Sequence, residues 1–368
     1  MIILEGSVGS FITIERTSYH YFAGNNYLGM ANRPEVIAAA CEALKKYGTN
    51  VAASRRTTGT TDIHLQLEKQ LAQFKGQDDA IVFSSGYLGN KLLMDQLKNE
   101  ITVVITDSMT HSSILEGIPP TIQEIANYKH GNMKQLESLL NDFKQQNILI
   151  ATDGIFALTG DIAPLDEIYA LAQKHQALVL VDDAHATGIL GKHGRGTPEH
   201  FGLHNAPGLF QSETMSKAFG SYGGFVAGSH QLITPIREKS AFYGASTALP
   251  PVLAAAGIAS LQFLEKHPDL HSKLLAKASQ LKTAIATLGY ITNEITTPIV
   301  PLFFEHATEA QQLSNFLKAN QIIAPVVNYP VKADQAILRL ALSIDHSEEQ
   351  LDYLLSTLKK WKEHHGRN

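Results

Sequence analysis

The chain has 368 residues, of which 44% are hydrophobic and 18% charged, a balance typical of an ordinary globular protein with a large core. Its formal net charge of -5 is small and spread along the chain, so we expect no nucleic-acid partner. Cys41 is the only cysteine, which excludes an intramolecular disulfide and a cysteine-built metal site and favours a reducing cytoplasm.

Neither the first residues nor the most apolar run predict a membrane or secreted location. The first nine residues lack a basic region and a cleavage pattern, so we expect no secretory signal. The most apolar run, residues 249–264, ends at Glu265 and is shorter than the roughly 20 residues of a membrane span.

The pattern of elements predicts an α/β fold. Residues 11–22 alternate like a short hairpin, and residues 34–47 have helical periodicity. From residue 79 to residue 228, short β-branched runs alternate with turns and helix-period segments, which is typical of an α/β sheet. Strands are predicted at 80–83, 102–105, 147–151, 177–181, 208–211 and 223–227, and helices at 86–97, 133–143 and 165–174. Several of these strands are apolar throughout, which indicates burial on both faces.

After this block the pattern changes. Residues 251–288 form a long helical region, and strands predicted at 299–304 and 338–343 alternate with helices. We therefore predict an N-terminal segment (1–40), a large domain (41–250) and a smaller C-terminal α+β domain (251–368). Ligands of open α/β sheets bind outside the carboxyl ends of the strands, so the residues that follow the strands are the candidates for a site.

The first candidate follows the strand at 177–181, where Asp182, Asp183 and His185 occur within four residues. A carboxylate at this place could keep a pyridinium nitrogen protonated, and that proton makes pyridoxal phosphate (PLP) an electron sink. The same residues could also be solvated groups of a turn, or half of a metal site.

The second candidate is Lys217 in the run Ser-Glu-Thr-Met-Ser-Lys-Ala-Phe-Gly, which follows the strand at 208–211. A lysine in such a place suits a Schiff base, because burial lowers the pKa of the amine from its usual value of about 10.4. A solvated lysine is the alternative. Together the two runs have the order of a fold-type I PLP enzyme, with the aspartate strand before the lysine strand.

Further motifs make the resemblance specific. They are Asn26-Tyr27-Leu28-Gly29, Ser54-Arg55 with Gly59, His64 and Glu68, Ser85-Gly86-Tyr87, Asp107 with His111-Ser112-Ser113, Gly160-Asp161, Asp182-Asp183-Ala184-His185, Thr214-Met215-Ser216-Lys217, Ser246-Thr247-Ala248-Leu249-Pro250-Pro251 and Leu338-Arg339-Leu340. In this order they resemble the α-oxoamine synthase family from about residue 26 to residue 346. The resemblance implies a fold-type I PLP-dependent transferase, with a mostly parallel seven-stranded sheet in a large α/β/α domain.

The resemblance also implies roles around the cofactor. Lys217 would form the Schiff base, and Asp182 would face the pyridine nitrogen. His185 would contact the phenolic oxygen, and His111 would stack on the ring. Taken alone, His111 could instead be a residue of a helix N-terminal turn.

The phosphate and the substrates are assigned in the same way. The phosphate would be held by the start of a helix, at Ser85, Gly86 and Tyr87, with Thr214 adding a hydroxyl. Ser246 and Thr247 would reach the phosphate of a neighbouring subunit, which implies a homodimer with shared active sites. Asn26 would line the substrate side, and Arg339 would bind the amino-acid carboxylate; without the resemblance Arg339 would be a strand-edge arginine in a surface ion pair.

The implied activity is a decarboxylative Claisen-type condensation of a small amino acid with an acyl thioester, on CoA or on a carrier protein. Residues 216–219 and 246–251 look like the members that use alanine and a pimeloyl thioester in biotin biosynthesis, which we favour. Residues 25–29, 59–64 and 151–154 look like the members that use glycine and acetyl-CoA. Other members, such as those that transfer palmitoyl to serine, are a further alternative.

Some features depart from the family pattern. The chain begins close to Asn26, without the helical extension common in the family, and the glycine-rich run at 48–53 is altered. Ala157 stands where a hydroxyl is usual.

Two rival functions remain: a catalytically silent scaffold subunit of the same fold, and a metal hydrolase that uses Asp182, Asp183, His185 and His193. The metal hydrolase has less support, because the sequence contains no His-Glu-x-x-His helix.

Overall fold

The computed structural model describes residues 2–327 and 336–365, which form two compact units. Unit 1 comprises Met1–Arg33, Ala157–Asp161 and Asp269–Asn368, and unit 2 comprises Pro34–Phe156 and Ile162–Pro268. The division after the central block lies near Pro268 and not near Pro250 as predicted, because the helix over Pro251–Lys266 packs on the helices over Pro34–Tyr47 and Asp62–Lys75.

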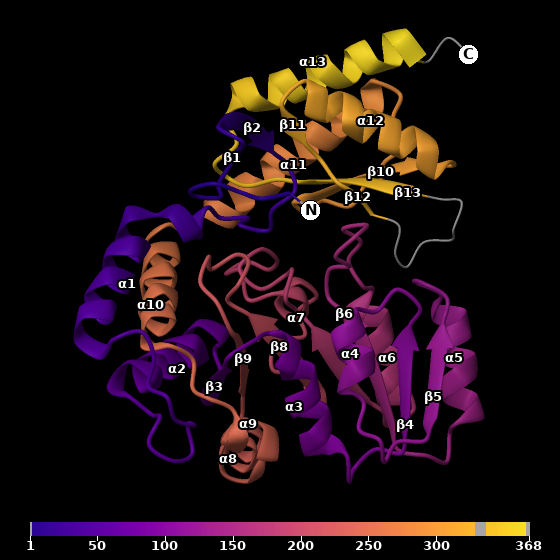
Figure 1. Ribbon diagram of the computed structural model, residues 1–368. Helices are drawn as coiled ribbons and strands as arrows, with labels where there is room; N and C mark the ends of the chain where they lie inside the picture. Colours follow the sequence, from indigo (N-terminus) through magenta and orange to yellow (C-terminus); the bar gives the residue numbers. More distant parts are fainter. Residues whose placement is uncertain (1, 328–335, 366–368) are drawn as a thin grey trace. The chain divides into compact units, whose positions relative to one another are not determined.

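Unit 2 is built on one sheet of seven strands with helices on both faces (Figure 1). The strands are β3 (Asp79–Phe83), β4 (Val103–Asp107), β5 (Glu124–Tyr128), β6 (Ile148–Asp153), β7 (Leu178–Asp182), β8 (Leu209–Thr214) and β9 (Gly224–Gly228). The helices are α1 (Pro34–Tyr47), α2 (Asp62–Lys75), α3 (Tyr87–Leu97), α4 (Ser112–Gly117), α5 (Met133–Asp142), α6 (Leu165–Lys174), α7 (Thr197–His200), α8 (His230–Lys239), α9 (Ala241–Ala245) and α10 (Pro251–Lys266).

The strand order is β3-β9-β8-β7-β6-β4-β5, and only β9 runs antiparallel to its neighbours. The predicted α/β class with a mostly parallel seven-stranded sheet is therefore confirmed. All six strands that the apolar runs predicted are present. The seventh, β5, lies at the sheet edge and exposes most of its residues, so it lacks the apolar run by which the others are recognised.

Both faces of the sheet are buried because successive side chains of a strand point in opposite directions. In β4, Val104 packs in a cluster with side chains of α3 and α4, whereas Val103 and Ile105 pack in a cluster with α5 and α6. In β3, Ile81 belongs to the first cluster, and Val82 packs in a third cluster with α2 and α10. Each fully buried side chain of this size contributes about 1.5–3 kcal/mol through the area that it removes from water.

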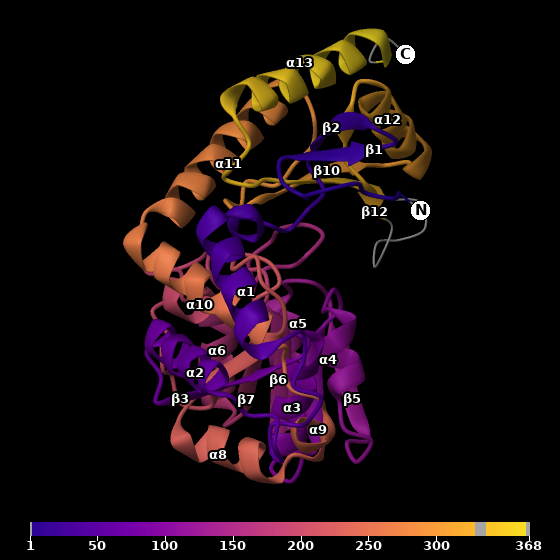
Figure 2. The same ribbon diagram turned by 60° about the vertical axis from the view of Figure 1, so that its left-hand side comes forward.

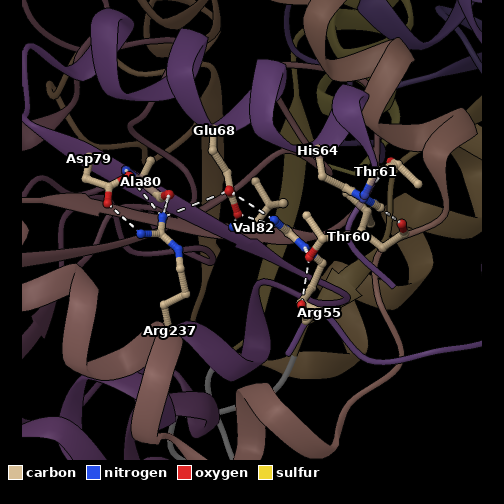
Figure 3. Close-up of polar contacts among 10 residues, drawn as sticks. Arg55, Thr60, Thr61, His64, Glu68, Asp79, Ala80, Val82 and Arg237 are labelled. Carbon is tan, nitrogen blue, oxygen red and sulfur yellow. Dashed lines mark hydrogen bonds and ion pairs between the residues drawn. The ribbon is translucent and has the colours of Figure 1, made fainter. Parts of the chain in front are cut away.

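Charged side chains close the free edge of the sheet at β3 (Figure 3). Glu68 of α2 accepts a hydrogen bond from the backbone N–H of Val82 at 3.1 Å. Arg237 of α8 donates to the carbonyl oxygen of Ala80 at 2.9 Å and forms a bidentate pair with Asp79. These bonds occupy the backbone groups with which another strand could pair, so the edge is protected against strand addition.

Unit 1 contains two small sheets and three long helices. Its strands are β1 (Phe11–Ile14), β2 (Thr17–Tyr21), β10 (Ile299–Phe304), β11 (Ile322–Ile323), β12 (Val326–Val327) and β13 (Ala336–Ala341), in the orders β1-β2-β11 and β10-β13-β12. The helices are η1 (Met30–Asn32), α11 (Leu270–Thr287), α12 (Ala307–Ala319) and α13 (Glu348–His365). Figure 1 shows α12 and α13 on the same side of the sheet that contains β10 and β13, and Figure 2 shows one end of α11 beside α13.

The helical region predicted over 251–288 is two helices, α10 and α11. It is interrupted at His267, because Pro268 has no N–H and its ring disfavours helical geometry in the residue before it. No helix in the described ranges 2–327 and 336–365 is long and apolar enough to cross a membrane.

Candidate active site

A cavity of about 160 Å³ lies in unit 2 at the carboxyl ends of β6, β7 and β8. Asp153, Asp182 and Thr214 are the last residues of these three strands, and all three line it. The complete lining is Ser85, Gly86, Tyr87, His111, Ser113, Asp153, Asp182, Ala184, His185, Thr214, Ser216 and Lys217. The structure thus brings together most of the residues singled out in the sequence, whereas Ser246 and Thr247 are not among the lining residues.

The start of α3 forms one wall of the cavity. Its N-cap Gly86 has no side chain with which to cap the helix, so the positive end of the helix remains available to an anion. A Cβ atom at position 86 would lie 2.7 Å from Cβ of Thr214, so only glycine allows this approach. The hydroxyl of Thr214 accepts a hydrogen bond from the N–H of Ser216 at 3.1 Å.

Two carboxyl groups form another part of the cavity, because Asp153 and Asp182 are paired residues of the neighbouring parallel strands β6 and β7. Asp182 accepts hydrogen bonds from Asn90 Nδ2 at 2.7 Å, from the backbone N–H of Ala184 at 3.1 Å and from Ser113 Oγ at 3.3 Å. Burial and the charge of Asp182 raise the pKa of Asp153 well above its usual range, although Lys217 acts in the opposite direction. Asp182 is therefore held in one orientation, and Asp153 retains its proton to a higher pH than an ordinary aspartate.

His111 both lines the cavity and caps the helix α4. Its Nδ1 accepts from the backbone N–H of Ser113 at 3.2 Å, so this nitrogen carries no proton, and the backbone N–H of His111 donates to the Asp153 carboxyl group at 2.8 Å. Its ring meets the ring of Tyr87 at 73°, with 6.1 Å between centroids. The cap fixes the ring while its other edge remains at the cavity. His185, in the loop after β7, is buried and lines the same cavity.

Lys217 lies in the turn between β8 and β9, and the core residues Met215 and Phe219 anchor this turn. The N–H of Met215 donates to Gly223 at 2.9 Å, and the N–H of Gly220 donates to the carbonyl oxygen of Lys217 at 3.0 Å. The side chain of Lys217 is half-buried, not buried as the sequence suggested. Its position near Asp153 brings an amine and a carboxyl group together in the cavity.

Comparison with known proteins places this arrangement in a family. The model of the family described as aminotransferase class I and II matches residues 20–358. The chain belongs to this family. It is 36% identical to 8-amino-7-oxononanoate synthase from Thermoanaerobacter pseudethanolicus, an alignment that covers 98% of this chain and 92% of that protein.

Solved structures place it in the α-oxoamine synthase branch of that family. Serine palmitoyltransferase from Sphingomonas wittichii superposes with a TM-score of 0.94 at 29% identity, covering 99% of this chain and 92% of that chain. A serine palmitoyltransferase variant from S. paucimobilis with a bound PLP–myriocin aldimine has a TM-score of 0.93 at 30% identity, covering 100% of this chain and 93% of that chain. The predicted family and its cofactor, PLP, are therefore confirmed.

The cavity has the chemistry that this α-oxoamine synthase needs to hold PLP. The uncapped start of α3 suits a phosphate group, and the oriented carboxylate of Asp182 suits a protonated ring nitrogen. Lys217 provides the amine in the same cavity. Asn90, Ser113 and Asp153 were not given roles from the sequence. Asp153 could have been found, since it ends β6 as Asp182 ends β7.

Behind the cavity, a second charged cluster lies on the opposite faces of β7 and β8. Asp183 and Glu213 alternate along these strands with Asp182 and Thr214, so they point away from the cavity. Lys75 Nζ lies 2.7 Å from Glu213 Oε1, and both side chains are almost fully buried. Asp183 accepts from the backbone N–H of Thr197 at 3.1 Å, and burial raises its pKa. Burial also raises the pKa of Glu213, to about 7.

We expect Glu213→Gln to remove a pH-dependent part of the stability. The carboxyl group has a usual pKa of 4.5 and a pKa of about 7 in the folded protein. Between these values the unfolded chain releases the proton and the folded chain keeps it, so the free energy of unfolding of the wild type falls as the pH rises from about 4.5 to about 7. At about 1.4 kcal/mol per pKa unit, this loss is at most about 3.5 kcal/mol.

Urea unfolding of both proteins between pH 5 and pH 8 checks this prediction. The free energy of unfolding of Glu213→Gln relative to that of the wild type should increase with pH. The control is Glu137→Gln, which removes a carboxylate that pairs with Lys174 on the surface. If the curves of Glu213→Gln and the wild type are parallel over this range, the assigned titration is wrong.

In unit 1, Arg339 lies on the central strand of the sheet β10-β13-β12, and not at a sheet edge. Its side chain donates to the carbonyl oxygen of Ala157 at 2.6 Å and to Asn25 Oδ1 at 3.0 Å. Within residues 2–327 and 336–365, it pairs with no carboxylate, so the surface ion pair considered from the sequence is not formed. The Nδ2 atom of Asn26 is buried and has no hydrogen-bond partner in the same ranges. The guanidinium group of Arg339 is thus a buried cation without an anion among the described residues. Because such a group is costly, it favours a role for Arg339 in binding an anionic ligand.

No three His, Cys, Asp or Glu side chains in the described part of the chain are grouped so that they could hold a metal ion. Of the residues considered for a metal hydrolase, Asp183 faces away from the cavity, and His193 pairs with Glu199 at 2.6 Å. The cluster that such an enzyme requires is therefore not assembled by these residues.

Proposed function

We propose that the chain is an 8-amino-7-oxononanoate synthase, which condenses alanine with a pimeloyl thioester and releases carbon dioxide and the thiol. The observation that carries the reaction class is the cavity in which Lys217, Asp182 and the start of α3 meet. The choice of substrate rests on the relatives of that name, which share 36% identity over nearly the whole chain. A cytoplasmic location is consistent with the free and exposed Cys41.

The roles of the side chains follow from their positions. Lys217 would hold the cofactor covalently; once the amino acid has replaced it there, the free amine would remove the α-proton of the substrate and later return a proton to the product. Asp182 would keep the ring nitrogen protonated, since Asn90 and Ser113 hold its carboxylate in place. When bound, PLP accommodates the electron pair that the departing α-proton leaves on the substrate. His111 would cover the ring and His185 would contact its phenolic oxygen, since both line the cavity.

Ser85, Gly86, Tyr87 and Thr214 of one chain would hold the phosphate, since all four line the cavity. Ser246 and Thr247 do not line the cavity of their own chain. We therefore assign them to the phosphate of a second copy of the chain, in a homodimer with shared active sites.

Assays of thiol release test the proposed substrates. The purified protein is incubated with alanine and a pimeloyl thioester, on CoA or on carrier protein, and separately with glycine and acetyl-CoA. Release with the first pair supports the proposal. Prompt release with glycine and acetyl-CoA, but none with alanine and the pimeloyl thioester, overturns the choice of substrate. Release with neither pair favours either another substrate pair, such as serine and a palmitoyl thioester, or the scaffold subunit.

Arg339→Ala should raise the KM for alanine about tenfold to a hundredfold, because it removes charge-assisted hydrogen bonds to the substrate carboxylate. Arg339→Lys should recover only part of this loss, since an ammonium group cannot form the bidentate pair. Steady-state kinetics with varied alanine check both values. Arg33→Ala is the control, because Arg33 forms an exposed pair with Asp345 in the same unit. If the KM for alanine is unchanged in Arg339→Ala, Arg339 stabilises the fold but does not bind the substrate carboxylate.

A further inference from the structure

The segment that carries Ser246 and Thr247 is held in place by an earlier part of unit 2. The N–H of Ala248 donates to the carbonyl oxygen of Ala53 at 3.0 Å, and Thr247 forms an antiparallel bridge with Ser54. The carbonyl oxygen of Leu249 lies 2.6 Å from His64 Nε2. Three consecutive residues are therefore fixed by residues about 190 positions earlier.

His64 acts in this arrangement as a neutral donor of defined orientation (Figure 3). Its Nδ1 lies 3.2 Å from the backbone N–H of Thr61, so this nitrogen must accept a hydrogen bond. Its Nε2 must then carry the proton, because it faces the carbonyl oxygen of Leu249. The side chain is fully buried, and burial lowers its pKa, so the neutral form is favoured.

A buried ion pair one helical turn further along α2 holds the loop that pairs with this segment. Glu68 forms a bidentate pair with Arg55, at 2.8 and 3.0 Å, and both side chains are about 95% buried. Arg55 also donates to Thr60 Oγ1 at 3.1 Å, which closes the loop on itself. His64 and Glu68 are four residues apart and so lie on the same face of the helix (Figure 3).

The anchored segment presents hydroxyl groups that its own chain does not use. Ala248 and Leu249 are buried, whereas Thr247 is exposed. Within residues 2–327 and 336–365, the hydroxyl of Thr247 has no hydrogen-bond partner, and it does not line the cavity. A fixed backbone with a free hydroxyl is suited to a ligand that lies outside this chain.

We propose that His64, supported by the Arg55–Glu68 pair, is a positioning residue for the cofactor phosphate in the active site of the partner subunit. It fixes the backbone of Leu249 and thereby the hydroxyls of Ser246 and Thr247. This inference rests on the shared-site homodimer proposed above.

The affinity for PLP tests the positioning role. His64→Ala leaves the carbonyl oxygen of Leu249 without its donor, so the Kd of PLP should rise about tenfold, measured by titrating the apoprotein and following visible absorbance. His64→Gln should recover part of the affinity, because its amide can donate to the same oxygen.

His346→Ala is a matched control for the loss of stability. His346 is also buried, accepts from the backbone N–H of Ser343 at 2.9 Å and has Nε2 3.1 Å from the carbonyl oxygen of Tyr21. The control should be destabilised to a similar degree with no change in the Kd of PLP. An unchanged Kd in His64→Ala, or an equal rise in His346→Ala, would overturn the inference.

Mixed dimers test whether His64 acts across the subunits. A dimer with one Lys217→Ala subunit and one His64→Ala subunit, isolated through two affinity tags, contains a single site with Lys217. In the proposed arrangement this site receives the intact 246–249 segment of the Lys217→Ala subunit. The visible band of the lysine-bound cofactor should then appear with the PLP affinity of the wild type.

The outcomes separate this inference from the proposed function. If the mixed dimer keeps the weak affinity of the His64→Ala homodimer, His64 acts within its own chain and the inference fails. If gel filtration shows a monomer, the homodimer fails as well. The choice of substrate depends on neither result, since thiol release measures it independently.

Discussion

Lys217→Ala should abolish turnover and remove the visible absorption band of the lysine-bound cofactor. The side chain has two tasks in the proposed reaction, because it forms the covalent bond to PLP and then moves the α-proton. A positioned proton-transfer group alone contributes about 10²–10⁴-fold, so we expect a loss of at least about 10³-fold. Absorbance spectra of the purified variant and thiol release with saturating substrates measure the two effects.

Two further variants serve as controls. One tests whether the positive charge of Lys217 is sufficient without its amine, and the other tests a lysine outside the cavity lining. Lys217→Arg keeps a positive charge near Asp153 but cannot form the covalent bond, so it should be as inactive as the alanine variant. Lys91→Ala, on α3 and outside the cavity lining, should retain the band and the activity. If Lys217→Ala retains both, another amine holds the cofactor and the assignment of this cavity fails.

Asp182→Asn should lower turnover by about 10²-fold or more, with a smaller effect on folding. The amide can still accept hydrogen bonds from its neighbours, but it has no negative charge to keep the ring nitrogen protonated. Asp182→Glu should recover part of the activity. Turnover at saturating PLP and urea unfolding give the two effects separately.

Asp183→Asn is the matched control, because Asp183 is the adjacent acid and points to the other face of the sheet. It accepts from Thr197 and from Gln211 Nε2, each at 3.1 Å. Its replacement should therefore lower the free energy of unfolding by about 1–3 kcal/mol while the folded protein keeps its turnover number. If Asp182→Asn and Asp183→Asn lower the turnover number equally, the assignment of Asp182 to the cofactor and of Asp183 to stability alone is wrong.

The local pattern of the chain predicted the large sheet well. Six of its strands were recognised from short apolar runs, and four of these strands end at a polar residue: Asp107, Asp153, Asp182 and Thr214. Asp153 also ends a strand, but the stretch 151–154 was used only to compare substrates, so no role was assigned to this residue. β5 was missed for a physical reason, since an exposed edge strand has no need of an apolar face.

The environment of several site residues could not be predicted from neighbours in the sequence. Arg339 was a candidate for a surface ion pair, yet its side chain contacts the backbone of Ala157, 182 positions away, and pairs with no described carboxylate. Ala157 lacks the hydroxyl usual in the family, but its carbonyl oxygen still holds this arginine. Lys217 was expected to be buried and is half-buried, because its exposure depends on how the turn after β8 packs.

The sequence by itself determined the α/β class, the order of the strands that carry Asp182 and Lys217, and the family. These follow from periodicity, from turn chemistry and from motifs of a few residues, all of which act locally. Only the tertiary structure decided that Lys75 pairs with Glu213, that Glu68 pairs with Arg55, and that His64 holds Leu249. Burial and charge partners set the pKa values and orientations of these groups, and those partners are brought together only when distant segments pack.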